Sequence, residues 1–320
     1  MKICLIKTSS MGDILHTLPA LTDAQRAMPN LEVDWVVEEN FVEIPHWHNA
    51  VKQVIPIALR RWRKSPFSTT TRNQWKTYRT LLQAAQYDAV IDAQGLFKSA
   101  FFATRLANGC KHGYDRHSIR EPIAALFYDK HYAISYQQHA VERIRQLFAQ
   151  SLGYPLLTTQ GDYAIASHFQ QQPLTTPYVL FFHGTTKTDK FLPDHQWREL
   201  AEKLTALGIQ VCLPWSNPLE KQRADYIARG LPLVQILAKS SLSELAQHIV
   251  DAKAVISVDT GLAHLTAALD KLNITLYGAT DPKLIGAYGK NQHYLVADSM
   301  ANIHSDEILQ KLTALLALPH

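Results

Sequence analysis

Short apolar runs alternate with longer amphipathic stretches along most of this chain of 320 residues. The apolar runs are four or five residues long and rich in Val and Ile, which is typical of strands buried on both faces. The longer stretches repeat apolar residues at helical spacing. Strands that alternate with helices predict an α/β protein whose parallel sheets are covered by helices on both faces.

The alternation runs through two series. In the first we expect strands at 3–7, 33–37, 54–57 and 89–92, and helices at 13–27, 74–85 and 98–106. After residue 175 the pattern restarts, with strands at 178–182, 209–213, 233–237, 254–258 and 274–277 and helices at 194–206, 220–228, 242–249 and 262–269.

The break between the series, residues 154–177, is rich in Pro, Thr and Gln and poor in charge, which is typical of a linker. We therefore predict a first domain at 1–160, a linker at 161–176 and a second domain at 177–320, with the last helix packed back on the first domain. Ligands of such sheets bind beyond the carboxyl ends of the strands. Two facing domains of this kind are expected to enclose a cleft.

The composition places the chain among ordinary globular proteins, with 47% hydrophobic residues. No apolar run approaches the roughly 20 residues that span a bilayer, and the apolar run at the N-terminus is too short for a signal peptide. We therefore expect a cytoplasmic protein. Its cysteines, Cys4, Cys110 and Cys212, lack metal-ligand spacing, so we interpret them as core or near-surface residues.

Charge is distributed unevenly around a net value of +4. Residues 1–160 carry 19 Lys and Arg against 13 Asp and Glu, whereas the remaining residues carry 13 against 15. A basic half beside a mildly acidic half indicates that the first half meets an anionic partner. Ordinary scatter of surface charge is the alternative.

One stretch, "AVISVDTGLAHLTAAL" at 254–269, changes from strand period to helix period at Asp259, Thr260 and Gly261. The N–H groups and the dipole at the start of a helix bind anions, and Gly lets a pyrophosphate approach the backbone. His264 follows one turn later and can reach a ligand there. The alternative is an ordinary helix cap followed by a locally satisfied His.

A second turn, "FFHGTTKTDKFLPDHQW" at 181–197, follows the first strand of the second series. Gly184, Thr185 and Thr186 provide flexible backbone and hydroxyl donors, and Lys187 and Lys190 provide positive charge for a phosphate. A solvated polar loop is the alternative. Neither G-x-G-x-x-G nor a P-loop pattern occurs at these turns, which argues against a conventional dinucleotide or P-loop site.

In the first series, "KTSSMGDILH" places Asp13 at the start of the first helix. An Asp there is often only a cap, but a single carboxylate beyond a strand end also suits a general base that takes a proton from an acceptor hydroxyl.

The stretch "LRRWRKSPF" at 59–67 surrounds Trp62 with cations, which suits a phosphate-binding loop in contact with a lipid. A solvated loop is the alternative. Nucleic acid is a rival partner, but no recognition motif is present. The candidate basic residues for this side are Arg60, Arg61, Arg63, Lys64, Lys98, Arg116, Arg120, His139 and Arg143.

Several segments together resemble the lipopolysaccharide heptosyltransferase I family, within glycosyltransferase family 9, over nearly the whole chain. These segments are "KTSSMGDILHTLPALTDA", "VVEE", "RRWRK", "YDAVIDAQGLFKSA", "TTKTDK", "LPW", "SVDTGLAHLTAALD", "YGATDP" and "GAYGKNQ". The resemblance implies a GT-B fold, with two Rossmann-like domains. It also implies transfer of L-glycero-D-manno-heptose from ADP-heptose to Kdo on lipid A, with inversion and without a cofactor or a required metal.

The resemblance also implies roles for individual residues. Asp13 would be the catalytic base. From their charge, and not from the resemblance, we expect basic residues of the first domain to bind the Kdo-lipid A acceptor, namely Arg60, Arg61, Arg63, Lys64, Arg120, His139 and Arg143. The donor residues would be Thr185, Thr186, Lys190, Glu220, Ser240, Asp259, Thr260, Gly261 and His264. Ser240 stands where relatives place a Met against the adenine.

These expectations describe an enzyme that works at the cytoplasmic face of the inner membrane, held by charge, without nucleic acid as a partner. Another GT-B enzyme, such as a heptosyltransferase II or a nucleotide-sugar epimerase, is one alternative. A non-enzymatic two-lobed binding protein is the other.

Overall fold

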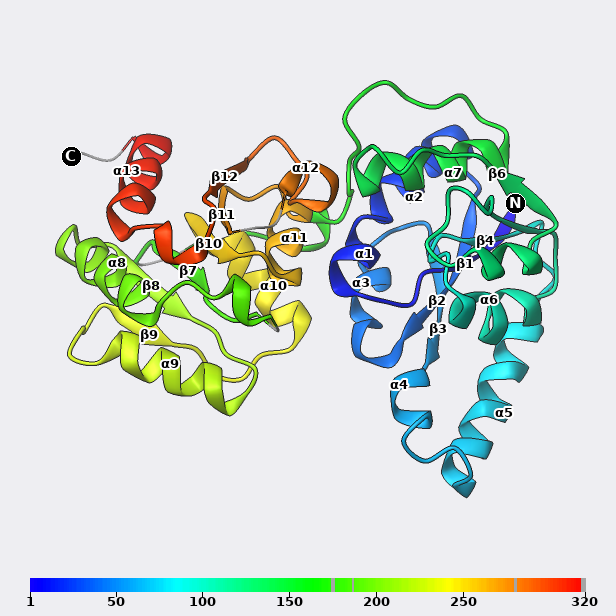
Figure 1. The fold of residues 1–320 in the computed structure, drawn as a ribbon, viewed down its shortest axis with the longest axis horizontal. Coiled ribbons are helices and arrows are strands. Elements are labelled where there is room, and N and C mark those ends of the chain that lie inside the picture. Colours follow the sequence, from blue (N-terminus) through cyan, green and yellow to red (C-terminus); the bar gives the residue numbers. More distant parts are fainter. Residues whose placement is uncertain (174–175, 186, 279–280, 318–320) are drawn as a thin grey trace. The chain divides into compact units, whose positions relative to one another are not determined.

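The computed structural model describes residues 1–173, 176–185, 187–278 and 281–317, and the chain divides into two compact units, Met1–Ala164 and Ile165–His320 (Figure 1). The boundary falls inside the segment 161–176, which the composition indicated as a linker. Each unit contains a parallel sheet with helices around it.

In the first unit the strands lie in the order β3-β2-β1-β4-β5-β6. Their bounds are β1 (Lys2–Ile6), β2 (Glu32–Glu38), β3 (Val51–Ile57), β4 (Ala89–Asp92), β5 (Lys111–Tyr114) and β6 (Lys130–Tyr132). The helices are α1 (Met11–Leu15), α2 (Leu18–Ala27), α3 (Glu43–His46), α4 (Leu59–Trp62), α5 (Thr69–Gln83), α6 (Phe97–Phe102) and α7 (Ala140–Leu152).

The single helix expected at 13–27 is divided into α1 and α2, because the helical hydrogen-bond pattern is interrupted between them, where Thr17 N donates to the main-chain oxygen of Ile14 at 3.1 Å. Pro19 has no N–H to donate to a carbonyl one turn earlier, and its ring clashes with that turn. Within the first turn of α2 the same residue is well tolerated. The break separates the short helix that carries Asp13 from the longer helix that packs against α7.

A buried ion pair joins α2 to α7. Arg145 Nε donates to Asp23 Oδ2 at 2.6 Å, and both side chains are 1% exposed. Arg145 also pairs with Glu142 at 2.9 Å.

The sequence did not predict β5, β6 or α7. Short strands with polar residues, and a helix flanked by polar loops, give weak periodic signals.

In the second unit the strand order is β12-β11-β10-β7-β8-β9. The bounds are β7 (Tyr178–Phe182), β8 (Gln210–Leu213), β9 (Val234–Ile236), β10 (Ala254–Val258), β11 (Asn273–Tyr277) and β12 (Gln292–Val296). The helices are α8 (Asp194–Ala206), α9 (Pro218–Ala228), α10 (Leu242–Asp251), α11 (Gly261–Ala268), α12 (Pro282–Ile285) and α13 (Ser305–Leu316).

The last helix, α13, packs against α8. Ile308 and Leu312 are fully buried in the same cluster as Trp197, and Ser305 N donates to Gln196 Oε1 at 2.6 Å. The apolar face of this helix is therefore used within the second unit, whereas the sequence suggested packing on the first domain.

The structure confirms the interpretation of the cysteines as core or near-surface residues. Cys4 and Cys212 are buried and Cys110 is half-buried, and all three are free thiols.

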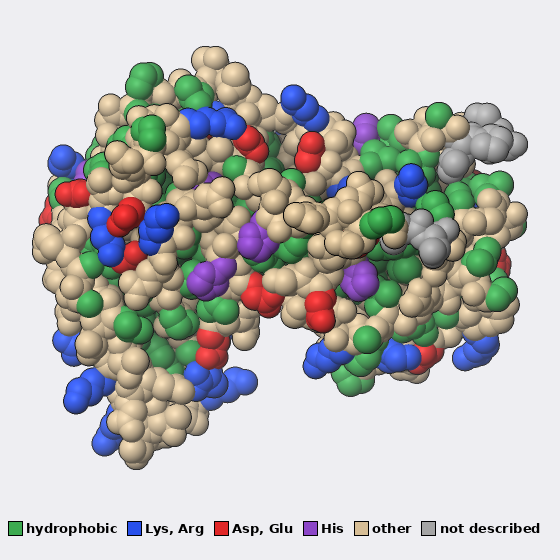
Figure 2. Space-filling view, turned by 180° about the vertical axis from the view of Figure 1, so that it is seen from behind, with side chains coloured by type: hydrophobic (Ala, Val, Ile, Leu, Met, Phe, Trp, Pro, Cys, Tyr) green, Lys and Arg blue, Asp and Glu red, His purple; other side chains and the backbone are tan. Residues whose placement is uncertain are grey.

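Among the described helices, we find none with the length and apolar character needed to cross a membrane. Basic side chains gather where α4 and α5 project from the first unit, at the lower left of Figure 2.

Candidate active site

Both sheets reverse their strand order at one point, between β1 and β4 in the first unit and between β7 and β10 in the second. In open parallel sheets, ligands bind beyond the carboxyl ends of the strands at such reversals. The turns that the sequence analysis singled out follow β1, β7 and β10. The strand order therefore brings two of these turns together within the second unit.

In the second unit, Lys190 and Asp259 form an ion pair. Lys190 follows β7 and Asp259 follows β10, and the two strands are direct neighbours in the sheet. Thr185 Oγ1 donates to the main-chain oxygen of Asp259 at 3.5 Å, which ties the same two turns together. Thr186 lies outside the described residues. Three candidate donor residues thus share one corner of the sheet.

At the start of α11 the backbone donors are partly used, because Ala263 N donates to the main-chain oxygen of Thr260 at 3.0 Å. Thr260 occupies the N-cap position, but its hydroxyl makes no cap hydrogen bond. The first N–H groups of any helix have no acceptors within the helix, and the dipole favours an anion beside them. His264 is 8% exposed, so its ring is largely enclosed by protein one turn into the helix. This helix start therefore suits a phosphate group.

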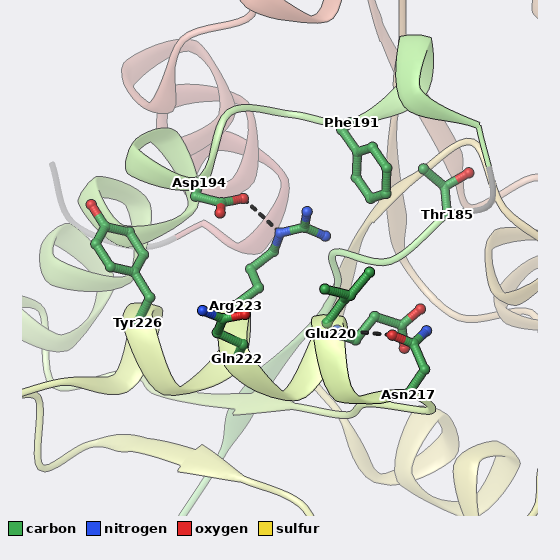
Figure 3. Close-up of a pocket in the computed structure, with 9 residues that line it drawn as sticks. Thr185, Phe191, Asp194, Asn217, Glu220, Gln222, Arg223 and Tyr226 are labelled. Carbon is green, nitrogen blue, oxygen red and sulfur yellow. Dashed lines mark hydrogen bonds and ion pairs between the residues drawn. The ribbon is translucent and has the colours of Figure 1, made fainter.

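Beside this corner lies a pocket of about 470 Å³ between α9 and the segment that leads from β7 into α8 (Figure 3). Glu220 lines the pocket, and its Oε2 accepts hydrogen bonds from Ser216 N and Ser216 Oγ, both at 2.7 Å. A Cβ on Gly184 would lie 2.5 Å from Glu220 Oε1. Gly184 is thus required for Glu220 to stand this close to the end of β7.

Arg223, which the sequence analysis missed, holds this region together. Its Nε donates to Asp194 at 2.6 Å, an Nη donates to the main-chain oxygen of His183 at 3.0 Å, and its guanidinium lies 4.4 Å from the centre of the Phe191 ring. Figure 3 shows the side chain pointing from α9 toward Asp194. No local motif could have identified it, because its three partners come from another part of the chain.

Ser240 makes a local contact, with its Oγ donating to the main-chain oxygen of Ala238 at 2.9 Å. The structure therefore gives this predicted donor residue a partner within its own turn.

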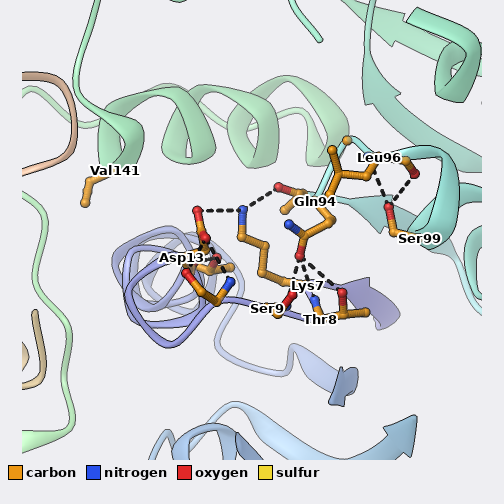
Figure 4. Close-up of polar contacts among 12 residues, drawn as sticks. Lys7, Thr8, Ser9, Asp13, Gln94, Leu96, Ser99 and Val141 are labelled. Atoms are coloured by element: carbon orange, nitrogen blue, oxygen red, sulfur yellow. Dashed lines mark hydrogen bonds and ion pairs between the residues drawn. The ribbon is translucent and has the colours of Figure 1, made fainter. Parts of the chain in front are cut away.

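In the first unit, Asp13 lies in α1 beyond the end of β1 (Figure 4). Ser10 N and Ser10 Oγ both donate to Asp13 Oδ2 at 2.8 Å. The side chain is 45% exposed, and Oδ1 lies 3.9 Å from Lys7 Nζ. One carboxylate oxygen is therefore held in place, while the group as a whole stays open to solvent.

Lys7, another residue that the sequence analysis did not select, is buried beneath Asp13. Its Nζ donates to the main-chain oxygen of Ala93 at 2.9 Å. Burial lowers the pKa of this ammonium, and the charges of Asp13 and Asp92 oppose that shift. The buried ammonium group therefore lies next to the exposed carboxylate of Asp13.

The turn before α1 is fastened to the turn after β4. Gln94 Oε1 accepts hydrogen bonds from Thr8 N at 2.9 Å and from Ser9 N at 3.1 Å. The main chain at Gln94 is held in turn by the buried Asp92, whose Oδ1 accepts from Gln94 N at 2.9 Å. Burial raises the pKa of Asp92, and the hydrogen bonds that it accepts from Gly95 N and from the hydroxyls of Thr104, Tyr128 and Ser99 oppose that rise. This network fixes the backbone that presents Asp13.

The basic candidates of the first unit separate into exposed and engaged groups. Arg60, Arg63 and Lys64 are exposed around α4. Arg61 is also exposed, but its guanidinium is occupied by Glu39 at 2.7 Å and by Gln74 at 2.8 Å.

The expectation that Trp62 contacts lipid is wrong. Its side chain is 7% exposed, and its ring packs edge-on against Trp75 and Tyr78. Its Nε1 donates to Gln74 at 2.9 Å. Trp62 stands among cations in the sequence because α4 packs one face, with Trp62, into the core and exposes the basic residues on its other face.

The remaining acceptor candidates have different environments. Arg143 donates to the main-chain oxygen of Ser118 at 2.6 Å and lies 3.7 Å from the centre of the Tyr136 ring. His139 precedes α7, and its Nδ1 accepts from Val141 N at 3.2 Å. Arg120 is exposed. Arg143 therefore has a structural role as well as a charge to offer.

Among the described residues, no group of three or more His, Cys, Asp or Glu side chains is arranged to hold a metal ion. In the part of the site that the structure describes, positive charge for an anion comes from Lys190 and from helix N–H groups.

Comparison with known proteins extends these observations. The model of glycosyltransferase family 9 (heptosyltransferase) matches residues 75–313. The chain is 55% identical to lipopolysaccharide heptosyltransferase 1 of Escherichia coli, over 98% of this chain and 100% of that protein.

Two solved structures of the E. coli heptosyltransferase WaaC are also similar. The structure with ADP has a TM-score of 0.96 and 53% identity, covering 98% of this chain and 99% of that one. The structure with ADP-2-deoxy-2-fluoro heptose has a TM-score of 0.93 and 52% identity, covering 98% and 100%. With its paired parallel sheets of GT-B type, this chain belongs to glycosyltransferase family 9, the heptosyltransferases, and is a glycosyltransferase.

Proposed function

We propose that this enzyme transfers L-glycero-D-manno-heptose from ADP-heptose to a Kdo residue of the lipopolysaccharide inner core, on Kdo-lipid A. The observation that carries the proposal is the likeness, along nearly the full length, to a heptosyltransferase whose solved structure is described with an ADP-heptose analogue. The charge and the donors at the corner formed by Lys190, Asp259 and α11 also suit a sugar diphosphate.

In this proposal the second unit binds the donor. A diphosphate carries more negative charge than the single carboxylate of Asp259, so it would share Lys190 with that residue. The N–H groups at Thr260 and Gly261 bind the diphosphate as it leaves. Asp259 would be repelled by phosphate and instead accepts hydrogen bonds from heptose hydroxyls. Glu220, held by Ser216, accepts from the ribose.

The first unit supplies the base and binds the acceptor. Asp13 takes the proton of the acceptor hydroxyl while that oxygen forms a bond to the anomeric carbon of heptose, and the bond from this carbon to ADP breaks. Attack on the face opposite the leaving ADP inverts the anomeric configuration. The two hydrogen bonds from Ser10 orient the carboxylate of Asp13 for this step.

We also propose that the reaction needs no metal ion, because Lys190 and the helix start neutralise the departing ADP. The acceptor is a lipid, so the enzyme would act as a peripheral protein on the cytoplasmic face of the inner membrane. The exposed side chains of Arg60, Arg63 and Lys64 would bind the anionic groups of the acceptor.

The test is a transfer assay with ADP-heptose and Kdo-lipid A, in which NMR reads the configuration of the new glycosidic bond. A heptosylated product with inverted configuration is expected. UDP-sugars and lipid A without Kdo serve as controls. Equal transfer from a UDP-sugar, equal transfer to lipid A lacking Kdo, or a retained configuration would each contradict the proposal.

A further inference from the structure

A long basic segment surrounds α4 and α5. Residues 44–87 contain eight Lys and Arg and no Asp or Glu. Arg60, Arg61, Arg63 and Lys64 lie in or directly after α4 and were already candidates for acceptor binding. The cations on α5 have not been assigned any role.

Three of these cations form one stripe along α5. Arg72, Lys76 and Arg79 are spaced i, i+4 and i+7, so they project from one side of the helix over about 10 Å. All three are exposed. Tyr78 and Leu82, on the other side, are buried in the cluster that contains Trp62. We call Arg72, Lys76 and Arg79 the α5 stripe.

The charge of the α5 stripe is not neutralised locally. Among the described residues, no ion pair involves any of the three side chains. Other cations of the same segment are differently placed, since Arg61 is paired with Glu39. A row of unpaired cations on one side of a helix is complementary to an extended anionic surface.

An apolar side chain accompanies the stripe. Phe67, in the turn just before α5, is 83% exposed and therefore unlike the buried Trp62. Cations beside an exposed aromatic residue are typical of contact with the headgroup layer of a membrane, where the ring inserts and the cations remain among the lipid phosphates. Figure 2 shows basic side chains on this projecting part of the first unit.

We propose that the α5 stripe and Phe67 form a docking surface for an anionic lipid bilayer. The proposed function gives this docking its purpose, since a lipid acceptor lies in such a bilayer, but the binding itself needs neither acceptor nor donor. Nucleic acid is the competing anionic surface. The exposed Phe67 at one end of the stripe favours lipid, because it provides an apolar group that a bilayer can bury.

The experiment measures binding of the full chain to phosphatidylcholine vesicles with and without phosphatidylglycerol, by co-sedimentation at low salt and without substrates. The test variant is Arg72→Gln, Lys76→Gln and Arg79→Gln combined. The matched control combines Arg229→Gln, Lys253→Gln and Lys290→Gln, which are exposed cations of the second unit, so that both proteins have the same net charge.

A Lys or Arg close to an anionic leaflet strengthens binding roughly fivefold, so the test variant should bind anionic vesicles about a hundredfold more weakly than the wild type. The control variant should stay within about twofold, as expected when only net charge changes. A charge-preserving variant, with Arg72→Lys, Lys76→Arg and Arg79→Lys, should bind like the wild type. Phe67→Ser should weaken binding several-fold at high salt, where charge is screened.

Equal loss in the test and control variants would overturn the proposal, as would tighter binding of the wild type to duplex DNA than to anionic vesicles at the same salt. Transfer to a water-soluble Kdo acceptor separates this result from the proposed function. If heptose is transferred to the soluble acceptor but vesicle binding does not depend on the α5 stripe, the proposed docking surface is wrong and the proposed function stands. If vesicles bind through the α5 stripe but no heptose is transferred, the docking surface stands and the proposed function is wrong.

Discussion

Lys190 and Asp259 are 69 positions apart in the sequence and form an ion pair where two neighbouring strands end. Pairing of Ala254 with Val179 and of Ser257 with Phe182 aligns β10 with β7, so the turns after both strands leave the sheet at the same corner. The two side chains are 17% and 9% exposed. Such a pair is largely shielded from water, so each charge depends on the other.

Replacing Lys190 by Gln should therefore lower the stability of the second unit and weaken donor binding. The carboxylate of Asp259 loses its cation in a largely buried place, which costs about 1–3 kcal/mol in the free energy of unfolding. Urea denaturation and ADP titration measure the two effects. Adding Asp259→Asn should restore part of the stability but not the ADP affinity.

Lys187→Gln is the matched control, because Lys187 is an exposed cation on the same turn. If Lys187→Gln and Lys190→Gln have the same effect on ADP affinity, general charge and not the position of Lys190 attracts the donor.

Asp13→Asn should abolish most transfer while leaving the fold and donor binding intact. An Asn oxygen can still accept the hydrogen bond from Ser10 N, but it cannot take a proton. Loss of a general base typically lowers the rate by about 10²–10⁴-fold. The measurements are kcat with both substrates saturating and the Kd for ADP. Turnover near the wild-type value would mean that Asp13 serves only as a helix cap.

The basic residues around α4 should differ in what they do. Arg60→Gln, Arg63→Gln and Lys64→Gln combined should raise the acceptor KM about tenfold and leave the donor Kd unchanged, because exposed contacts to phosphate contribute up to about 1 kcal/mol each. Added salt should raise the wild-type KM more than that of the variant. An unchanged acceptor KM would assign these residues to the solvated surface.

Arg61→Gln should behave differently from its neighbours, since Arg61 joins Glu39 to Gln74. We expect it to loosen α4 against α5, which circular dichroism during thermal unfolding detects as a lower Tm. An effect on acceptor KM with an unaltered Tm would show that Arg61 is free to contact the acceptor.

Activity should survive exhaustive treatment with EDTA. In this interpretation Lys190 and the N–H groups at the start of α11 stabilise the negative charge of the leaving diphosphate, so the reaction does not require a divalent ion. The measurement is the initial rate before and after chelation, with the chelator removed by gel filtration. Loss of activity that Mg²⁺ or Mn²⁺ restores would contradict this assignment of roles.

The stability of the first unit should fall on acidification because of His48. Burial lowers the pKa of this residue from its ordinary 6.5 to about 4. Ala50 N donates to Nδ1 at 3.2 Å, a bond that protonation of Nδ1 would break. Between these two pKa values the unfolded chain binds a proton that the folded chain does not, so stability decreases as pH falls.

From pH 7 to pH 5 this effect amounts to about 2 kcal/mol, measured as the difference in the free energy of unfolding in urea. His48→Gln should remove it. His46→Gln is the control, because His46 is an exposed residue two positions earlier, and it should leave the pH dependence as in the wild type. Identical pH slopes for all three proteins would exclude His48 as the cause.

The local pattern of the sequence was sufficient for the strands that form the centre of each sheet and for the turns that follow them. β4, β7 and β10 have the predicted bounds. Continuous runs of residues such as Val, Ile and Phe are typical of strands whose side chains are buried on both faces of a sheet. The turns at Asp13, Lys190 and Asp259 were recognisable because phosphate-binding and acid–base groups follow β1, β7 and β10 in the sequence.

Tertiary structure decided which of these turns meet and which side chains are available. The neighbouring positions of β7 and β10, and hence the pair of Lys190 with Asp259, depend on sheet order, which no local period encodes. Trp62 is buried and Phe67 exposed because α5 packs over the former and not the latter. Arg223 and Lys7 acquire their partners only through contacts between distant segments, since hydrogen bonds and burial are properties of the assembled core.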